Sequence, residues 1–142
     1  MTTPPAPDGP RPAAGPPLAG PGGLLPAGPT LSLASHRGPH HAIVTVDGAI
    51  DYHTAPQLLG HLSTPETQGV PLLILDLARV DFCDSSALGA FVEIQRRRSA
   101  AGHRFALTGV QLEVRRILEL TQLTSVLPLH ATVEEALAAN RP

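Results

Sequence analysis

The chain has 142 residues, which is the length of a single ordinary domain. Its 10 basic residues are all Arg and stand against 12 Asp and Glu, so the formal net charge is −2. This balance argues against a general nucleic-acid binder, which would carry a basic face. The single Cys excludes a disulfide scaffold and a cysteine-rich zinc site.

The sequence shows neither a membrane-spanning segment nor an export signal. The longest apolar stretch, Val70–Leu75, contains Pro71 and is much shorter than the roughly 20 apolar residues of a spanning helix. The first residues lack the basic and apolar regions of a signal peptide. We therefore expect a cytoplasmic protein without an inserted segment.

Residues 1–30 differ in composition from the rest of the chain. They contain ten of the 16 Pro and six of the 13 Gly, and only Asp8 and Arg11 are charged. Such a segment buries too little apolar surface to offset the entropy lost on ordering. The composition predicts a disordered tail, which could be a docking segment or an inert extension, followed by a folded domain over residues 31–140.

The domain alternates strand and helix patterns. Aliphatic, β-branched or alternating runs predict five strands, at residues 31–35, 42–46, 70–77, 105–107 and 126–129. Apolar residues at helical spacing predict one helix beginning after Thr54 and three more over residues 85–101, 113–121 and 132–139. The resulting order, β-β-α-β-α-β-α-β-α, is typical of an α/β fold with a largely parallel sheet.

Several residue pairs predict where these elements begin and end. The expected boundaries are a Gly-Pro turn within 37–41, a turn or bulge at Asp47-Gly48, capping boxes at Thr54/Gln57 and Thr132/Glu135, a connection containing Val80, Phe82 and Cys83, and a helix end at Gly102. Pro128 favours an edge position for the last strand, because proline cannot donate to a neighbouring strand.

The most informative stretch begins at Asp84, a favoured helix N-cap. It places the hydroxyls of Ser85 and Ser86 in the first turn of a helix, where unpaired N–H groups and the helix dipole favour a phosphate. A phosphoryl group on Ser85 would add about −1.5 to −2 charges beside Asp84. From spacing alone, both a phosphorylation switch and a simple helix cap remain open.

The same stretch resembles the signature of STAS domains, specifically the bacterial anti-sigma factor antagonists. In those proteins an apolar strand ends in Asp-Leu, an aromatic residue follows, and then Asp-Ser-Ser/Thr-Gly-Leu-Gly. Here the matching residues are Asp76-Leu77, Phe82 and Asp84-Ser85-Ser86-Ala87-Leu88-Gly89. Further matches in the same order are Gly48–Asp51 with Thr54-Ala55, Arg96–Gly102 with Phe105–Leu107, Val114–Thr121 and Thr132–Leu137.

This resemblance implies a fold, a role and a set of site residues. The fold would be a mixed, largely parallel sheet with helices mainly on one face. The role would be to bind an anti-sigma factor, itself a serine kinase of the histidine-kinase-like ATPase type, and so to release a sigma factor for RNA polymerase. Phosphorylation at Ser85 would switch the protein off, and a PP2C-type phosphatase would reset it.

The resemblance also implies where a partner would bind. The expected binding residues are Asp51, Tyr52, Thr54, Asp84, Ser85, Ser86, Ala87 and Gly89. Asp51 could equally be a turn carboxylate, and Tyr52 could equally be a packed surface residue. The sequence departs from the family pattern at Ala87, where Gly is usual, and at Ala49, where Glu is usual.

The sequence leaves two other functions open. No enzyme is expected, because Gly-x-Ser-x-Gly is absent, although a small serine hydrolase acting through Ser85 or Ser86 stays an alternative. The first alternative function is that of a constitutive STAS scaffold or of an accessory subunit of a membrane transporter.

No cofactor or metal is expected, and the basic helix end suggests no site of its own. His36 and His40 flank a turn, and His53 and His61 lack a carboxylate at motif spacing. Cys83 is expected to be a buried small residue. The three arginines 96–98 are expected to be a solvated face near a helix end.

Overall fold

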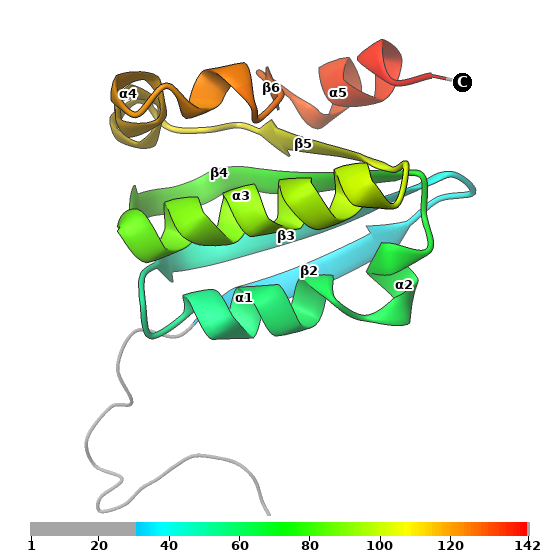
Figure 1. Cartoon of the computed structure of the whole chain (residues 1–142), viewed down its shortest axis with the longest axis horizontal. Helices are drawn as coiled ribbons and strands as arrows, with labels where there is room; N and C mark the ends of the chain where they lie inside the picture. Colours follow the sequence, from blue (N-terminus) through cyan, green and yellow to red (C-terminus); the bar gives the residue numbers. More distant parts are fainter. Residues whose placement is uncertain (1–30, 142) are drawn as a thin grey trace, which may run out of the picture. The chain divides into compact units, whose positions relative to one another are not determined.

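The structure is a computed structural model that describes residues 31–141 (Figure 1), so the tail predicted over residues 1–30 lies outside the described part. The strands are β2 (Ser32–Arg37), β3 (His41–Ile50), β4 (Leu72–Cys83), β5 (Arg104–Thr108) and β6 (Leu129–His130). The helices are α1 (Ala55–Leu62), α2 (Pro65–Gln68), α3 (Ser85–Ala100), α4 (Leu112–Leu120), the short 3₁₀ turn η1 (Leu123–Ser125) and α5 (Val133–Ala139).

The strands form one five-stranded sheet in the order β2-β3-β4-β5-β6. β2 pairs antiparallel with β3, and every other neighbouring pair is parallel. The mixed, largely parallel sheet predicted from the sequence is therefore confirmed. β6 is the edge strand that Pro128 predicted, and the carbonyl oxygen of Pro128 accepts a hydrogen bond of 2.9 Å from the Leu107 amide.

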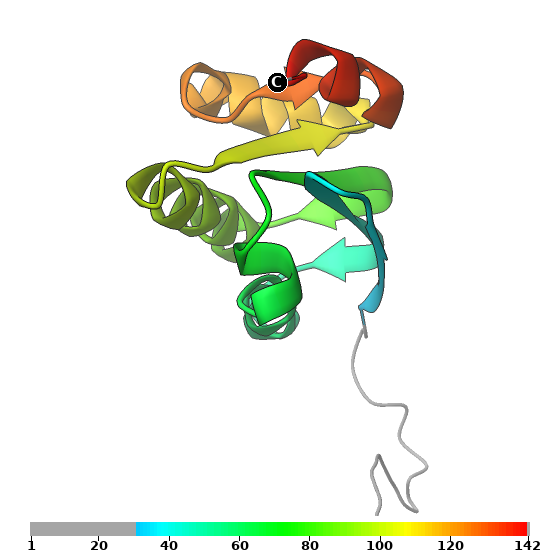
Figure 2. The same ribbon diagram turned by 90° about the vertical axis from the view of Figure 1, so that its right-hand side faces the viewer.

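The helices cover the two faces of the sheet unequally. Figures 1 and 2 agree in placing α1 and α3 against the same face, and Val114 and Leu118 of α4 belong to the same core. On the opposite face, α5 covers a smaller cluster through Ala136. The helices thus lie mainly on one face, as expected.

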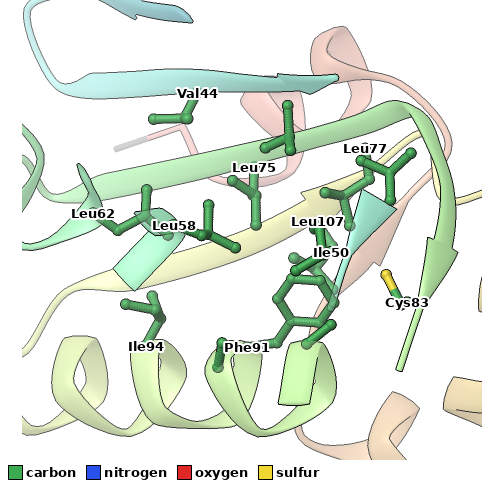
Figure 3. Packing of buried hydrophobic residues seen from close by; sticks show 14 of the residues in the cluster. Val44, Ile50, Leu58, Leu62, Leu75, Leu77, Cys83, Phe91, Ile94 and Leu107 are labelled. Atoms are coloured by element: carbon green, nitrogen blue, oxygen red, sulfur yellow. The ribbon is translucent and has the colours of Figure 1, made fainter. Parts of the chain in front are cut away.

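Alternation along β4 explains why both faces need a cover. Leu73, Leu75 and Leu77 contribute to the larger core, whereas Leu72 and Ile74 face α5. Figure 3 shows Leu75 among side chains from α1 and α3, including Leu58 and Phe91. A strand buried on both faces requires the nearly continuous apolar run that the sequence shows at 70–77.

Strand β4 is longer than predicted. Residues 80–83, which were expected in a connection, extend β4 to Cys83 and pair with the end of β3. The prediction was wrong because the register between β3 and β4 shifts twice, on either side of Asp47, so the alternation that marks a regular strand is broken there. Gly48 has φ 127° and lies within β3, opposite the extra residues of β4, so the signal at Asp47-Gly48 marks an irregular part of the strand pair and not a turn.

The capping box predicted at Thr54 is also wrong, although α1 begins directly after Thr54 as expected. Thr54 makes no side-chain cap bond, because its Oγ1 accepts from the Asp51 amide at 2.9 Å and donates to the Ala49 carbonyl oxygen at 2.9 Å. The Gln57 side chain donates instead to the carbonyl oxygen of Leu31. At the other predicted box, Thr132 does cap α5 by accepting from the Glu135 amide.

The basic end of α3 is only partly solvated. Arg96 and Arg97 form surface ion pairs with Glu93, in line with the expectation. Arg98 contradicts it, since this residue is only 5% exposed and its guanidinium donates to the carbonyl oxygens of Thr67, Val70 and Arg104. Gly102, with φ 77°, follows the helix as predicted. No helix among residues 31–141 is long and apolar enough to cross a membrane.

Candidate functional site

Two segments far apart in the sequence meet where β3 and β4 end. The connection after β3 and the first turn of α3 lie at the same end of the sheet (Figure 1). Ile50 pairs with Cys83 as the last residues of their strands, and the Asp84 amide donates to the Ile50 carbonyl oxygen at 3.2 Å. The parallel pairing of β3 and β4 therefore brings residues 51–54 next to residues 84–89.

The Asp84 side chain connects these two segments. Its Oδ1 accepts from the Ser86 amide at 2.8 Å and from the Ala87 amide at 3.1 Å, which confirms Asp84 as the N-cap of α3. Its Oδ2 accepts from the Tyr52 amide at 3.1 Å. One carboxylate thus caps the helix and also fixes the connection that follows β3.

Asp51 organises the neighbouring turn. Its Oδ1 accepts from the amides of His53 at 2.9 Å and Thr54 at 3.0 Å, while Thr54 Oγ1 accepts from the Asp51 amide. Desolvation raises the pKa of the Asp51 carboxyl, but the hydrogen bonds from Thr54 and His53 outweigh it, so the pKa lies below its usual value. Asp51 therefore acts as a turn carboxylate, one of the two interpretations left open by the sequence.

Ser85 occupies the first position of α3 and is exposed. Among residues 31–141, no hydrogen-bond partner of its hydroxyl is found, and the residue faces the outside. Ser86 is half-buried, and its amide is already bound to Asp84. Of the two hydroxyls, that of Ser85 is the better placed for a modifying enzyme.

Two exposed aromatic residues belong to the segments that meet at this serine. Tyr52 is 66% exposed and Phe82 is 51% exposed. The sequence did not assign Phe82 to the surface, because residues 78–83 were predicted to be a connection. In the structure Phe82 pairs with Ala49, so β4 continues past Leu77. Predicting the exposed position of Phe82 would have required predicting this longer strand. We define the Ser85 rim as Asp51, Tyr52, Phe82, Asp84, Ser85 and Gly89.

Three of the predicted partner-binding residues differ in how accessible they are to a partner. Thr54 is 2% exposed and Ala87 is fully buried, so neither side chain presents surface to a partner in this conformation. Gly89 is exposed in the middle of α3, and a Cβ added there would meet no atom within 4 Å. Glycine in a helix interior is destabilising by about 0.5–1 kcal/mol relative to Ala, and packing within residues 31–141 does not require it.

Neither a thiol site nor a metal site is found nearby. Cys83 is 2% exposed, as predicted, and its burial, aided by the charge of Asp84, raises the pKa of its thiol to about 12. Across the described residues, there is no group of three or more His, Cys, Asp or Glu side chains that could hold a metal ion.

Comparison with known proteins places this geometry in a family. The model of the STAS domain matches residues 33–136. This chain belongs to the STAS domain family. The match covers the described strands except Ser32 of β2, and the two segments of the Ser85 rim lie within it.

Several of the similar proteins are anti-sigma factor antagonists. A candidate anti-sigma factor antagonist of Thermotoga maritima is 34% identical over 70 residues, which cover 49% of this chain and 62% of that relative, slightly less than two thirds of its length. The crystal structure of an anti-sigma factor antagonist from Mycobacterium paratuberculosis has a TM-score of 0.71 and 27% identity, covering 79% of this STAS domain chain and 95% of that one.

One similar protein has been solved in two states. The anti-sigma factor antagonist SpoIIAA in its unphosphorylated form has a TM-score of 0.66 and 25% identity, covering 78% of this chain and 96% of that one. Its phosphorylated form, from Bacillus, has a TM-score of 0.61 and covers 78% of this chain. The relatives described above are thus named as anti-sigma factor antagonists, and one of them has been solved with phosphate.

Proposed function

We propose that this STAS domain is an anti-sigma factor antagonist whose unphosphorylated Ser85 rim binds an anti-sigma factor and thereby releases a sigma factor. The anti-sigma factor would also be the serine kinase, of the histidine-kinase-like ATPase type, that phosphorylates Ser85. A PP2C-type phosphatase would remove the phosphate, and the protein itself would catalyse nothing. The observation that carries the proposal is the exposed Ser85 hydroxyl at the first position of a capped helix.

The rim has the chemical character of a protein-binding surface. Tyr52 and Phe82 expose aromatic area, and aromatic residues are enriched in the cores of protein interfaces. Gly89 leaves open space over the first turns of α3, so a partner could approach the helix backbone closely there. These features support docking of another protein directly over Ser85.

The same geometry explains how phosphate would end the interaction. A phosphoryl group adds about −1.5 to −2 charges next to Asp84. The carboxylate of Asp84 already occupies the amides of Ser86 and Ala87, so these N–H groups cannot neutralise the new charge unless Asp84 gives them up. A dianion buried without a partner in a packed interface is costly, and the complex should dissociate.

A phosphorylation map tests the modification. The protein would be recovered from its own cells and analysed by intact mass and by peptide, alongside Ser85→Ala and the matched control Ser86→Ala. The proposal expects phosphate on the parent and on Ser86→Ala, and none on Ser85→Ala. A Ser85 that stays unmodified through growth and stress would contradict it and would favour a constitutive scaffold or a transporter subunit.

A further inference from the structure

A second site lies at the opposite end of the molecule from the Ser85 rim. A cavity of about 630 Å³ opens beside the start of β4, between the β2–β3 hairpin and the last residues of α5. In Figure 1 this is the end at which the C-terminus is marked, whereas α3 begins at the other end. Small-molecule pockets in proteins commonly measure about 300–1,000 Å³, so the cavity is large enough for a ligand.

The charged groups around this cavity are all of one sign. Arg104 and Arg141 line it together with His40 and His41, and no Asp or Glu is among the lining residues. None of the ion pairs found within residues 31–141 includes Arg104 or Arg141. Two guanidinium groups in a concave site that no carboxylate of residues 31–141 lines attract an anion.

The position of Arg104 is fixed by hydrogen bonds on both sides. Its amide donates to the Pro71 carbonyl oxygen at 2.8 Å, and its own carbonyl oxygen accepts from the buried guanidinium of Arg98. Its Nη1 donates to the Asn140 carbonyl oxygen at 3.3 Å, which leaves its other N–H groups available. The backbone of Arg104 is therefore fixed, and one hydrogen bond ties its guanidinium to Asn140.

Arg98 does not line the cavity but adds positive potential close to Arg104. Its guanidinium is buried, and it bonds only to carbonyl oxygens within residues 31–141. Carbonyl oxygens satisfy its hydrogen bonds but do not cancel its charge. An anion bound at Arg104, whose carbonyl oxygen contacts Arg98, would be favoured by this charge as well.

The remaining walls are apolar. Leu72 is nearly buried and belongs to the cluster beneath α5, and Leu137 of α5 packs against the same cluster. Pro39 and Pro71 line the cavity as well. A ligand that fills the space must therefore combine an anionic group with an apolar part.

We propose that this cavity binds a small organic anion with an apolar body, its carboxylate or phosphate held by Arg104 and Arg141. The site is separate from the Ser85 rim, and the proposal does not depend on phosphorylation of Ser85. It gives this STAS domain a second input, in which a small molecule binds at one end while a protein partner binds at the other.

Titration of the isotope-labelled full chain, followed by NMR, tests this proposal. The probes are octanoate and octyl phosphate, compared with acetate and inorganic phosphate, which lack the apolar body. We expect saturable shifts at Leu72, Arg104 and Leu137, and little change at Ser85. Both long probes should bind at least about tenfold more tightly than their short counterparts, and the tighter of the two identifies the head group as carboxylate or phosphate.

Variants decide whether the guanidinium groups are responsible. Arg104→Gln and Arg141→Gln should each weaken binding of the long probes by about tenfold or more. Arg115→Gln, which removes an exposed charge on α4, is the matched control and should bind like the parent. Shifts that do not saturate, shifts centred elsewhere, or unchanged affinity in Arg104→Gln would overturn the proposal.

Discussion

Replacement of Asp84 tests whether one carboxylate holds the Ser85 rim together. In Asp84→Ala, the amides of Ser86 and Ala87 lose their cap, and the Tyr52 amide loses its acceptor. Loss of an N-cap costs about 1 kcal/mol, and loss of a hydrogen bond to a charged group costs about 1.5–3 kcal/mol. Because the carboxylate is half-exposed, we take the lower value and expect the free energy of unfolding to fall by about 2–3 kcal/mol.

A second substitution separates the two functions of the carboxylate. In Asp84→Asn, the side-chain oxygen can still cap α3, but the amide nitrogen cannot accept a hydrogen bond from Tyr52. We expect this variant to lose only about 1.5 kcal/mol, the value of the lost bond from the Tyr52 amide. Thr132→Ala, which removes a single cap bond at α5, is the control and should lose about 1 kcal/mol.

Urea unfolding provides the measurement, with the free energy obtained by linear extrapolation and the slope checked for change. The expected order of stability is parent, then Asp84→Asn together with Thr132→Ala, then Asp84→Ala. The reasoning would be refuted if Asp84→Ala unfolded within about 0.5 kcal/mol of the parent, or if Asp84→Asn were as unstable as Asp84→Ala.

Four other substitutions have clear expected outcomes in the same unfolding assay. Arg98→Met should lower the free energy of unfolding by about 3 kcal/mol, because buried carbonyl oxygens lose their donors, whereas Arg97→Met on the surface should change it by less than about 1 kcal/mol. Asp51 has a lowered pKa when folded, so its contribution to stability is present above its unfolded pKa and is lost as pH falls through the folded value. Asp51→Asn should therefore make unfolding less dependent on pH in the acid range. Gly89→Ala should raise the free energy of unfolding by about 0.5–1 kcal/mol but weaken partner binding, and a stabilised variant with full binding would contradict the proposed close approach.

Much of the fold could be predicted because strong local signals agree with the tertiary structure. The apolar run 70–77 forms the buried part of β4, and Asp84 caps α3 as its position predicted. Pro128 correctly indicated an edge. At each of these positions the local chemistry and the packing favour the same structure.

The failures arise where distant residues decide the outcome. Thr54 could have capped α1, but the Asp51 turn takes its hydroxyl, and Gln57 reaches a carbonyl oxygen 26 residues away. Arg98 has the sequence pattern of a surface residue, yet the chain at Thr67 and Val70 supplies buried acceptors for it. No local pattern shows such partners.

The candidate site could likewise be predicted only in part. The motif around Ser85 indicated the two segments, and the fold brings them together through Asp84. The sequence could not show that Ala87 faces the core or that Phe82 faces outward, because both depend on how far β4 continues and where α3 packs. The cavity near Arg104 was not predicted, since its lining comes from five separate stretches of the chain.

The central claim is that phosphate on Ser85 controls binding of an anti-sigma factor. The partner would first be captured on the unphosphorylated chain from the cells that produce this protein. The most direct measurement is then the affinity of that partner for two purified forms of this protein, one unmodified and one phosphorylated at Ser85. We predict that phosphorylation weakens binding by about 100-fold or more, which corresponds to roughly 3 kcal/mol. Equal affinity of the two forms would contradict a phosphorylation switch at the Ser85 rim.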